Sequence, residues 1–221
     1  MTQPDEILKT LRDTYKIPIV PKSKVDPFKT LIVTILSQNT NDRNTEKAFE
    51  RLSNDFRIDP ETLAKAHIKQ LEASLKVAGL YRNKAKTIKK VSKIVNETYH
   101  NDLQQILLKP VEEARNELML LPGVGPKTAD VVLLFAAKKP TMPVDTHVNR
   151  VSKRLGLVPE KGGYEAVREA LQSLYDPQNY LAIHILLIAH GRNFCKARFP
   201  LCETCPLKEL CPSRSLFRRV S

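Results

Sequence analysis

The stretch LPGVGPKT, residues 121–128, joins two segments of helical periodicity and most directly decides the fold. Pro122 ends the helix before it, and Pro126 favours the first turn of the helix after it. Gly123 and Gly125 permit a tight turn whose backbone no Cβ atom obstructs. Because the N-terminus of a helix attracts anions, the pattern predicts two helices joined by a phosphate-binding hairpin. An ordinary glycine turn between packed helices is the alternative.

Lys127 lies in the first turn of the second helix, where the positive end of the helix dipole opposes its charge. This placement favours the neutral amine, which is the form that acts as a nucleophile. Lys127 is therefore a candidate catalytic residue. A lysine that only binds phosphate fits the local sequence about as well.

Asp145 lies in the segment VDTH, residues 144–147, and directly precedes another predicted helix. Its simplest role is to cap that helix. A catalytic role requires the carboxylate to face Lys127 across a cleft. There it would stabilise a positively charged sugar and assist proton transfer.

Helical spacing recurs along the rest of the chain, and alternating β-branched runs with tight hairpin turns are missing. The fold class is therefore predicted to be all-α. Pro140 and Pro143 interrupt the helical pattern within residues 138–143, which marks a domain boundary, and a second break is expected at 17–21. The final long helix is expected over 177–190, with Gly191 as its C-cap.

All four cysteines of the chain lie near its C-terminus, at Cys195, Cys202, Cys205 and Cys211, with the spacing C-x6-C-x2-C-x5-C. Four thiolates this close in sequence suit an iron–sulfur cluster or a tetrahedral zinc ion, and the spacing does not choose between them. Disulfides would need an oxidising compartment, which nothing in the sequence indicates.

The chain has 221 residues, of which 42% are hydrophobic, and a formal net charge of +12. No apolar run reaches the roughly 18 residues of a transmembrane helix, and the polar N-terminus is no signal peptide. We therefore expect a prokaryotic cytoplasmic protein, associated with the nucleoid, and no membrane partner. Six basic residues and no acid lie within 82–93, a clustering that favours a nucleic-acid footprint over a mixed surface.

Two further segments are weaker candidates for DNA contact. Gln38 and Asn39 form an amide-rich corner after a helix, where amides commonly cap the backbone; the alternative is that one of them enters a duplex. Leu80 and Tyr81 follow Gly79 and precede the basic helix, where core packing competes with wedging between base pairs. The histidines at 147, 184 and 190 are given no catalytic role.

Taken together, the hairpin at 121–128, the VDTH segment, the HGR segment at 190–192 and the four cysteines resemble the endonuclease III family of helix-hairpin-helix DNA glycosylases. The resemblance implies two helical domains: a six-helix barrel over 22–138, and a cluster domain made of 1–21 and 139–221. It also implies a DNA cleft between them, with Lys127 and Asp145 at its mouth. The cysteines would hold a [4Fe–4S] cluster that organises a basic loop at 196–200.

The implied activity is base excision repair by a monomer that acts on double-stranded DNA containing damaged pyrimidines or abasic sites. Lys127 would displace an oxidised pyrimidine, form a Schiff base and cleave the strand by β-elimination, with Asp145 in support. The damaged nucleotide would be flipped out of the base stack to reach the active site. The predicted DNA contacts are Gln38, Asn39, Leu80, Tyr81, Gly123, Gly125, Thr128, His147, Lys196 and Arg198.

Related enzymes offer alternatives. Adenine-mismatch glycosylases place a catalytic glutamate in the helix that matches residues 30–37, which holds no acid here, and both they and the thymine-mismatch glycosylases lack Lys127. A monofunctional thymine or uracil glycosylase and a non-catalytic DNA-binding module are the competing functions. Pro126 stands where the family usually has a basic residue. Asn39 aligns best with the inserting glutamine of the family, and Gln38 lies one position before it.

Overall fold

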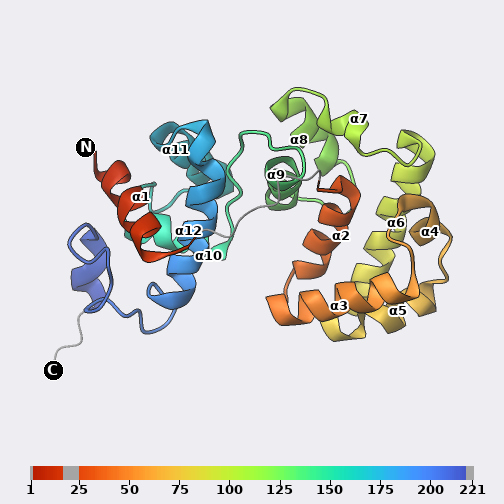
Figure 1. The fold of residues 1–221 in the computed structure, drawn as a ribbon, viewed down its shortest axis with the longest axis horizontal. Helices are drawn as coiled ribbons and strands as arrows, with labels where there is room; N and C mark the ends of the chain where they lie inside the picture. The colour runs from red at the N-terminus through yellow and green to blue at the C-terminus, as the bar shows by residue number, and fades with distance from the viewer. Residues whose placement is uncertain (1, 17–24, 218–221) are drawn as a thin grey trace. The chain divides into compact units, whose positions relative to one another are not determined.

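The computed structural model describes residues 2–16 and 25–217. Within these residues all regular secondary structure is helical (Figure 1). The predicted all-α class is confirmed. The elements are α1 Gln3–Thr14, α2 Pro27–Ser37, α3 Asp42–Asp55, α4 Pro60–Lys65, α5 Ile68–Leu75, η1 Lys76–Ala78, α6 Tyr81–Tyr99, α7 Gln104–Leu107, α8 Val111–Met119, α9 Pro126–Phe135, α10 Thr146–Arg154, α11 Tyr164–Leu174, η2 Pro177–Asn179, α12 Tyr180–Asn193 and η3 Pro212–Phe217, where η marks a 3₁₀ turn.

The chain divides into two compact units. One is Ser23–Lys139, and the other combines Met1–Lys22 with Pro140–Ser221. The division falls inside the proline-interrupted segment 138–143. The second expected break, at 17–21, lies outside the described residues.

Helix α2 runs through the core of the unit Ser23–Lys139 and packs against α9 and α3 (Figure 1). Asp26 caps its start by accepting hydrogen bonds from the N–H groups of Phe28, at 2.9 Å, and Lys29, at 3.1 Å. Its apolar side chains are fully buried at Leu31, Ile32, Ile35 and Leu36. Burial of each contributes about 1.5–3 kcal/mol. Helix α2 is therefore held rigidly in the core, and it fixes the position of Gln38 and Asn39, which follow its end.

A buried ion pair joins the two helices of the hairpin. Arg115 on α8 donates from Nε to Oδ1 of Asp130 on α9 at 3.0 Å. Both residues are withdrawn from solvent, with exposed fractions of 5% and 0%. The pair fixes α8 against α9 because separating the two charges would leave each one buried without its partner.

In the other unit, α12 packs against α10 and α1. The expected helix over 177–190 starts as the turn η2, and α12 continues to Asn193. The prediction that Gly191 caps this helix is therefore wrong. A Cβ at Gly191 would lie 2.9 Å from Nδ1 of His147 and 3.1 Å from Nη2 of Arg150. The glycine is needed inside the helix, because it lets α12 approach α10 closely.

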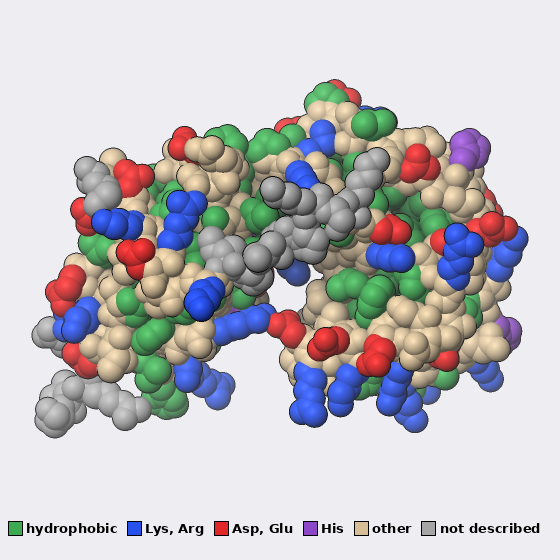
Figure 2. Space-filling model, in the orientation of Figure 1, with side chains coloured by type: hydrophobic (Ala, Val, Ile, Leu, Met, Phe, Trp, Pro, Cys, Tyr) green, Lys and Arg blue, Asp and Glu red, His purple; other side chains and the backbone are tan. Residues whose placement is uncertain are grey.

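The basic run of α6 is less exposed than the sequence suggested. Lys84 is only 4% exposed. Lys89 donates from Nζ to the carbonyl oxygens of Ala64, at 2.8 Å, and Ala66, at 2.6 Å. Lys84 is thus buried in the unit, and the ammonium group of Lys89 is bound to its backbone. On the face shown in Figure 2, basic side chains also extend from the edge near α3 and α5, with acidic side chains among them.

No helix within residues 2–16 and 25–217 is long and apolar enough to cross a membrane.

Candidate active site and metal centre

The hairpin between α8 and α9 has the glycine geometry that the sequence predicted. Gly123 has a φ of +75°, in the left-handed region that favours glycine. A Cβ there would lie 2.6 Å from Cγ2 of Thr87, so the turn also lies directly against α6. Gly125 is the N-cap of α9 and has no side chain to cap it. Consequently no capping side chain competes with an anion for the N–H groups of the first turn.

Lys127 is the second residue of α9, and its side chain is half-buried beside this turn. Thr128 follows it and is buried. The amine is thus carried by the first turn of a rigid helix that the Arg115–Asp130 pair holds in place.

The corner after α2 is tied to the same hairpin. Nε2 of Gln38 donates to the carbonyl oxygen of Gly123 at 3.0 Å and lies 3.4 Å from Oγ1 of Thr128. The amide of Gln38 therefore faces the protein. Asn39 is exposed and has a φ of 52°, which is uncommon for a residue other than glycine.

A second exposed tip lies between η1 and α6. Leu80 precedes α6 with a φ of 46°, and its side chain is 57% exposed. Left-handed backbone costs a residue with a Cβ roughly 1–2 kcal/mol. Tyr81 begins α6 and is half-buried, with Arg82 stacked 5.6 Å from its ring centroid. An apolar side chain held outward at this cost is a candidate for a functional contact.

Asp145 caps α10, as its simplest role predicted. Oδ1 accepts a hydrogen bond from the N–H of Val148 at 2.7 Å. The residues before it are buried and anchored: Val144 donates its N–H to the hydroxyl of Tyr164 at 3.3 Å, and the Pro143 carbonyl lies 2.9 Å from Nδ1 of His184. A carboxylate has a second oxygen, so capping by Oδ1 leaves Oδ2 for other chemistry. Lys127 and Asp145 belong to different units.

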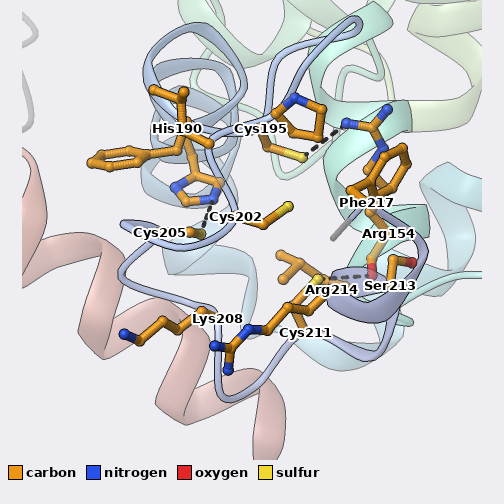
Figure 3. A pocket seen from close by; sticks show the side chains of 14 residues that line it. Arg154, His190, Cys195, Cys202, Cys205, Lys208, Cys211, Ser213, Arg214 and Phe217 are labelled. Carbon is orange, nitrogen blue, oxygen red and sulfur yellow. Dashed lines mark hydrogen bonds between the residues drawn. The ribbon is translucent and has the colours of Figure 1, made fainter. Parts of the chain in front are cut away.

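Four thiols turn towards one cavity in the unit that holds the C-terminus (Figure 3). The cavity has a volume of about 30 Å³ and is lined by Cys195, Cys202, Cys205 and Cys211 together with His190. All four cysteines are free thiols and partly buried. Burial raises the pKa of Cys202 and Cys211, and it raises the pKa of Cys205 to about 11. A bound metal would reverse this effect, because thiols that coordinate a metal are deprotonated.

His190 covers one side of this cavity. Its Nε2 lies 3.5 Å from Sγ of Cys205, and its Nδ1 lies 3.2 Å from the hydroxyl of Tyr15, the C-cap of α1. Phe194 stacks on its ring at 5.8 Å. Burial lowers the pKa of His190 to about 4, so the imidazole is neutral at neutral pH. The histidine is structural, and it joins the cysteine segment to α1.

Arg154, on α10, ties that helix to the loop between the first two cysteines. Its Nη1 donates to Sγ of Cys195 at 3.4 Å and to the carbonyl of Lys196 at 2.7 Å. Its Nη2 donates to the carbonyl of Ala197 at 3.2 Å. The loop presents Lys196 and Arg198 as exposed cations.

One turn earlier on α10, Arg150 donates from Nε to the Cys195 carbonyl at 3.0 Å and from Nη2 to the Gly191 carbonyl at 3.1 Å. The same Nη2 lies 3.0 Å from Nδ1 of His147. His147, expected to contact DNA, is thus placed against Arg150 and beside Gly191. Helix α10 therefore carries Asp145 at its start and holds the cysteine loop with its later turns.

The chain matches the family of HhH-GPD superfamily base excision DNA repair proteins over residues 32–177. It is 43% identical to the endonuclease III of Thermotoga maritima over 188 residues, which are 85% of this chain and 84% of that protein. The chain belongs to the endonuclease III family. It is a base excision repair DNA glycosylase with AP lyase activity.

Two more endonuclease III proteins show how much of the chain the likeness covers. The endonuclease III of Sulfolobus acidocaldarius is 34% identical over 216 residues, with 94% of each chain covered. The solved structure of a trapped endonuclease III–DNA covalent intermediate, an estranged-adenine complex, superposes with a TM-score of 0.84 at 33% identity. It covers 99% of this chain and 100% of the other.

The thiol donors of this endonuclease III family member suit an iron–sulfur cluster. Within the described residues, no three His, Cys, Asp or Glu side chains are arranged to hold a single metal ion. The four thiols line one cavity, and a cluster bound by one thiolate at each of its iron atoms would take donors placed in this way.

The sequence did not reveal the roles of Arg150 and Arg154 at the metal centre or the burial of Lys84 in α6. Lys84 had a detectable signal, because it lies one turn before Ile88 in the buried stripe of α6 and so interrupts an apolar pattern. The two arginines are four residues apart and share one face of α10. Their partners are backbone carbonyls of the cysteine loop, which sequence patterns do not encode.

Proposed function

We propose that this endonuclease III family member excises oxidised pyrimidines from double-stranded DNA and then cleaves the strand through a Schiff base at Lys127. The observation that carries the proposal is the position of Lys127 in the first turn of α9, beside a glycine hairpin whose N-terminal turn has no capping side chain. A phosphate bound by this turn would bring the sugar of the same nucleotide towards the amine. The helix dipole favours the neutral amine that the reaction needs.

The chemistry follows from the amine. Nζ of Lys127 attacks C1′ of the flipped nucleotide, forming a C–N bond as the glycosidic bond breaks, and the base leaves with the electron pair and takes up a proton. Ring opening gives the Schiff base, a cationic imine that acidifies the C2′ protons. Loss of a C2′ proton then expels the 3′ phosphate, which breaks the strand by β-elimination.

Asp145 would act on this reaction through its charge. The transition state for base loss carries positive charge on the sugar, which a carboxylate stabilises. Because Oδ1 is engaged with Val148, the carboxylate is held in one orientation by the start of α10. We therefore propose that Oδ2 faces the sugar and that Asp145 also assists proton transfer to Lys127.

The two exposed tips, Asn39 after α2 and Leu80 before α6, would enter the DNA duplex. Asn39 is the better candidate for the gap left by the flipped nucleotide, because the amide of Gln38 is already bound to the Gly123 carbonyl. Leu80 would wedge between neighbouring bases, with Tyr81 behind it. The loop of Lys196 and Arg198 would contact phosphates, since both side chains are exposed cations. We propose that the protein acts as a monomer on chromosomal DNA in the cytoplasm.

We propose a [4Fe–4S] cluster as the group bound by the four cysteines. The four thiols that line one cavity support it. When bound, the cluster would supply structural cross-linking and not a step of base excision. Visible absorbance of the purified protein tests this, because zinc has a filled d shell and is colourless. Stoichiometric zinc in a colourless protein would refute the cluster.

Borohydride trapping tests the role of Lys127. On a duplex with one thymine glycol, borohydride should reduce the imine and give a stable covalent adduct, and Lys127→Ala should abolish the adduct. Lys69→Ala is the matched control, because Lys69 is an exposed lysine on α5 of the same unit. Adduct formation that survives Lys127→Ala would reject the proposed nucleophile. Base release from an intact strand that breaks only on addition of alkali would indicate a monofunctional enzyme.

A further inference from the structure

Lys84 is a buried lysine whose ammonium lies between two chain segments. Its Nζ donates to the carbonyl oxygen of Leu36, near the end of α2, at 2.8 Å. It also donates to the carbonyl oxygen of Ala78, at the end of η1, at 2.8 Å. Both partners are therefore carbonyls at the ends of helical segments, where backbone oxygens lack partners from within the helix. A cation suits these positions because the C-terminal end of a helix is negative.

The two segments held by Lys84 lead directly to the two exposed tips. Asn39 lies three residues after Leu36, and Leu80 lies two residues after Ala78. Each tip has a left-handed backbone, with φ of 52° at Asn39 and 46° at Leu80. Left-handed residues other than glycine persist only where the surrounding structure holds them. A single ammonium thus anchors the approach to both strained tips.

The burial of Lys84 opposes its own charge. The side chain is 4% exposed, and burial lowers the pKa of the amine. An apolar residue would complete the stripe of Ile88 and Val91 without this cost. The position of the charge is therefore better explained by what it holds than by the stability of α6.

We propose that Lys84 is a positioning residue that fixes the distance between Asn39 and Leu80. Asn39 can then fill the gap left by the flipped nucleotide at the same time as Leu80 wedges between the neighbouring bases. The inference rests on the proposed function, in which these two tips enter the duplex. Lys84 itself touches neither substrate nor reacting atoms. Its loss should impair the opening of a paired duplex more than the chemistry at an already unpaired lesion.

The test compares Lys84→Met with Lys89→Met. Lys89 is a matched control, because it lies on the same helix and its Nζ also binds two carbonyls. These belong to Ala64 in α4 and to Ala66 directly after it, and not to the segments that lead to the tips. Single-turnover excision is measured on two duplexes, one with thymine glycol opposite adenine and one with thymine glycol opposite an abasic analogue. The ratio of the two rates does not depend on the fraction of active protein.

For Lys84→Met we expect the rate on the paired duplex to fall by about tenfold, which corresponds to about 1.4 kcal/mol of activation free energy. The rate opposite the abasic analogue should change much less. With 2-aminopurine opposite the lesion, the fluorescence rise that reports unstacking should shrink. Lys89→Met should leave the rate ratio and the fluorescence at the wild-type level.

Equal losses on both duplexes, an unchanged ratio, or the same selective loss in Lys89→Met would overturn the proposal. Lys84→Gln, which keeps an amide donor, serves if the methionine variant does not fold, and the same ratio is expected to fall for it. Failure of the wild-type protein to excise any lesion would instead reject the proposed function.

Discussion

Asp145 has an observed role as a helix cap and a proposed role in base excision, and substitution can separate the two. Its carboxylate caps α10 through Oδ1, and the proposed reaction uses the negative charge. Asparagine has nearly the same shape and also caps helices well, whereas alanine cannot cap. Asp145→Asn should therefore remove the charge and keep the cap, and Asp145→Ala should remove both.

The expected magnitudes follow from these contacts. Loss of the 2.7 Å cap in Asp145→Ala should cost about 1 kcal/mol of unfolding free energy. For a chain of this size that corresponds to a decrease in Tm of roughly 2–4 °C. Asp145→Asn should lower Tm by much less. Both variants should lose base excision by roughly 10²-fold or more, the usual effect of removing an electrostatic or acid–base group.

Thermal unfolding and single-turnover excision on a thymine-glycol duplex measure the two effects in the same protein samples. Asp145→Ser is the control, because serine caps helices without a charge and should behave like asparagine in both assays. Excision by Asp145→Asn within a few-fold of the wild-type rate would refute the electrostatic role. Equal decreases in Tm for asparagine and alanine would refute the capping role.

Two further changes test the supports of the site. Asp130→Ala should lower the unfolding free energy by about 3 kcal/mol, because it leaves Arg115 buried without its carboxylate, and adding Arg115→Met should recover part of the loss in denaturant unfolding; a near-neutral single variant would contradict this. Arg154→Met should release the loop after Cys195, so visible absorbance should decay faster in air and DNA affinity should fall; retention of both at wild-type levels would show that the contacts are dispensable.

The sequence was sufficient to predict the helices, the hairpin glycines and the shared site of the four cysteines, because each of these depends on a local pattern of residues. Pro126 was expected in the first turn of the helix after the hairpin, and α9 begins at this residue. Gly123 and Gly125 were expected to permit a tight turn between the two helices, and Gly123 adopts the left-handed backbone that favours glycine. The four cysteines were expected to share one site, and they line one cavity.

The sequence was insufficient where a residue's role depends on a distant partner. Gly191 looked like a helix cap because it follows a long apolar helix, but α12 continues past it to Asn193, and the glycine is required because a Cβ would meet His147. The lysines at 84 and 89 looked like part of a basic face, yet their ammonium groups bind backbone carbonyls of other segments. Gln38 and Asn39 could not be distinguished by type, and only the Gly123 carbonyl shows which amide is engaged.

Four of the proposed functional residues lie at the ends of helices. Lys127 lies in the first turn of α9, Asp145 caps α10, Leu80 precedes α6 and Asn39 follows α2. Helix ends have backbone groups without helical partners, so they bind phosphates and accept unusual backbone angles, while the helix behind them remains rigid. Substitutions inside these helices should consequently change stability first, and substitutions at their ends should change excision first. Lys84 is an exception, because it lies within α6 but binds the ends of two other helical segments. The excision rate of Lys84→Met on a paired duplex therefore tests this distinction most directly.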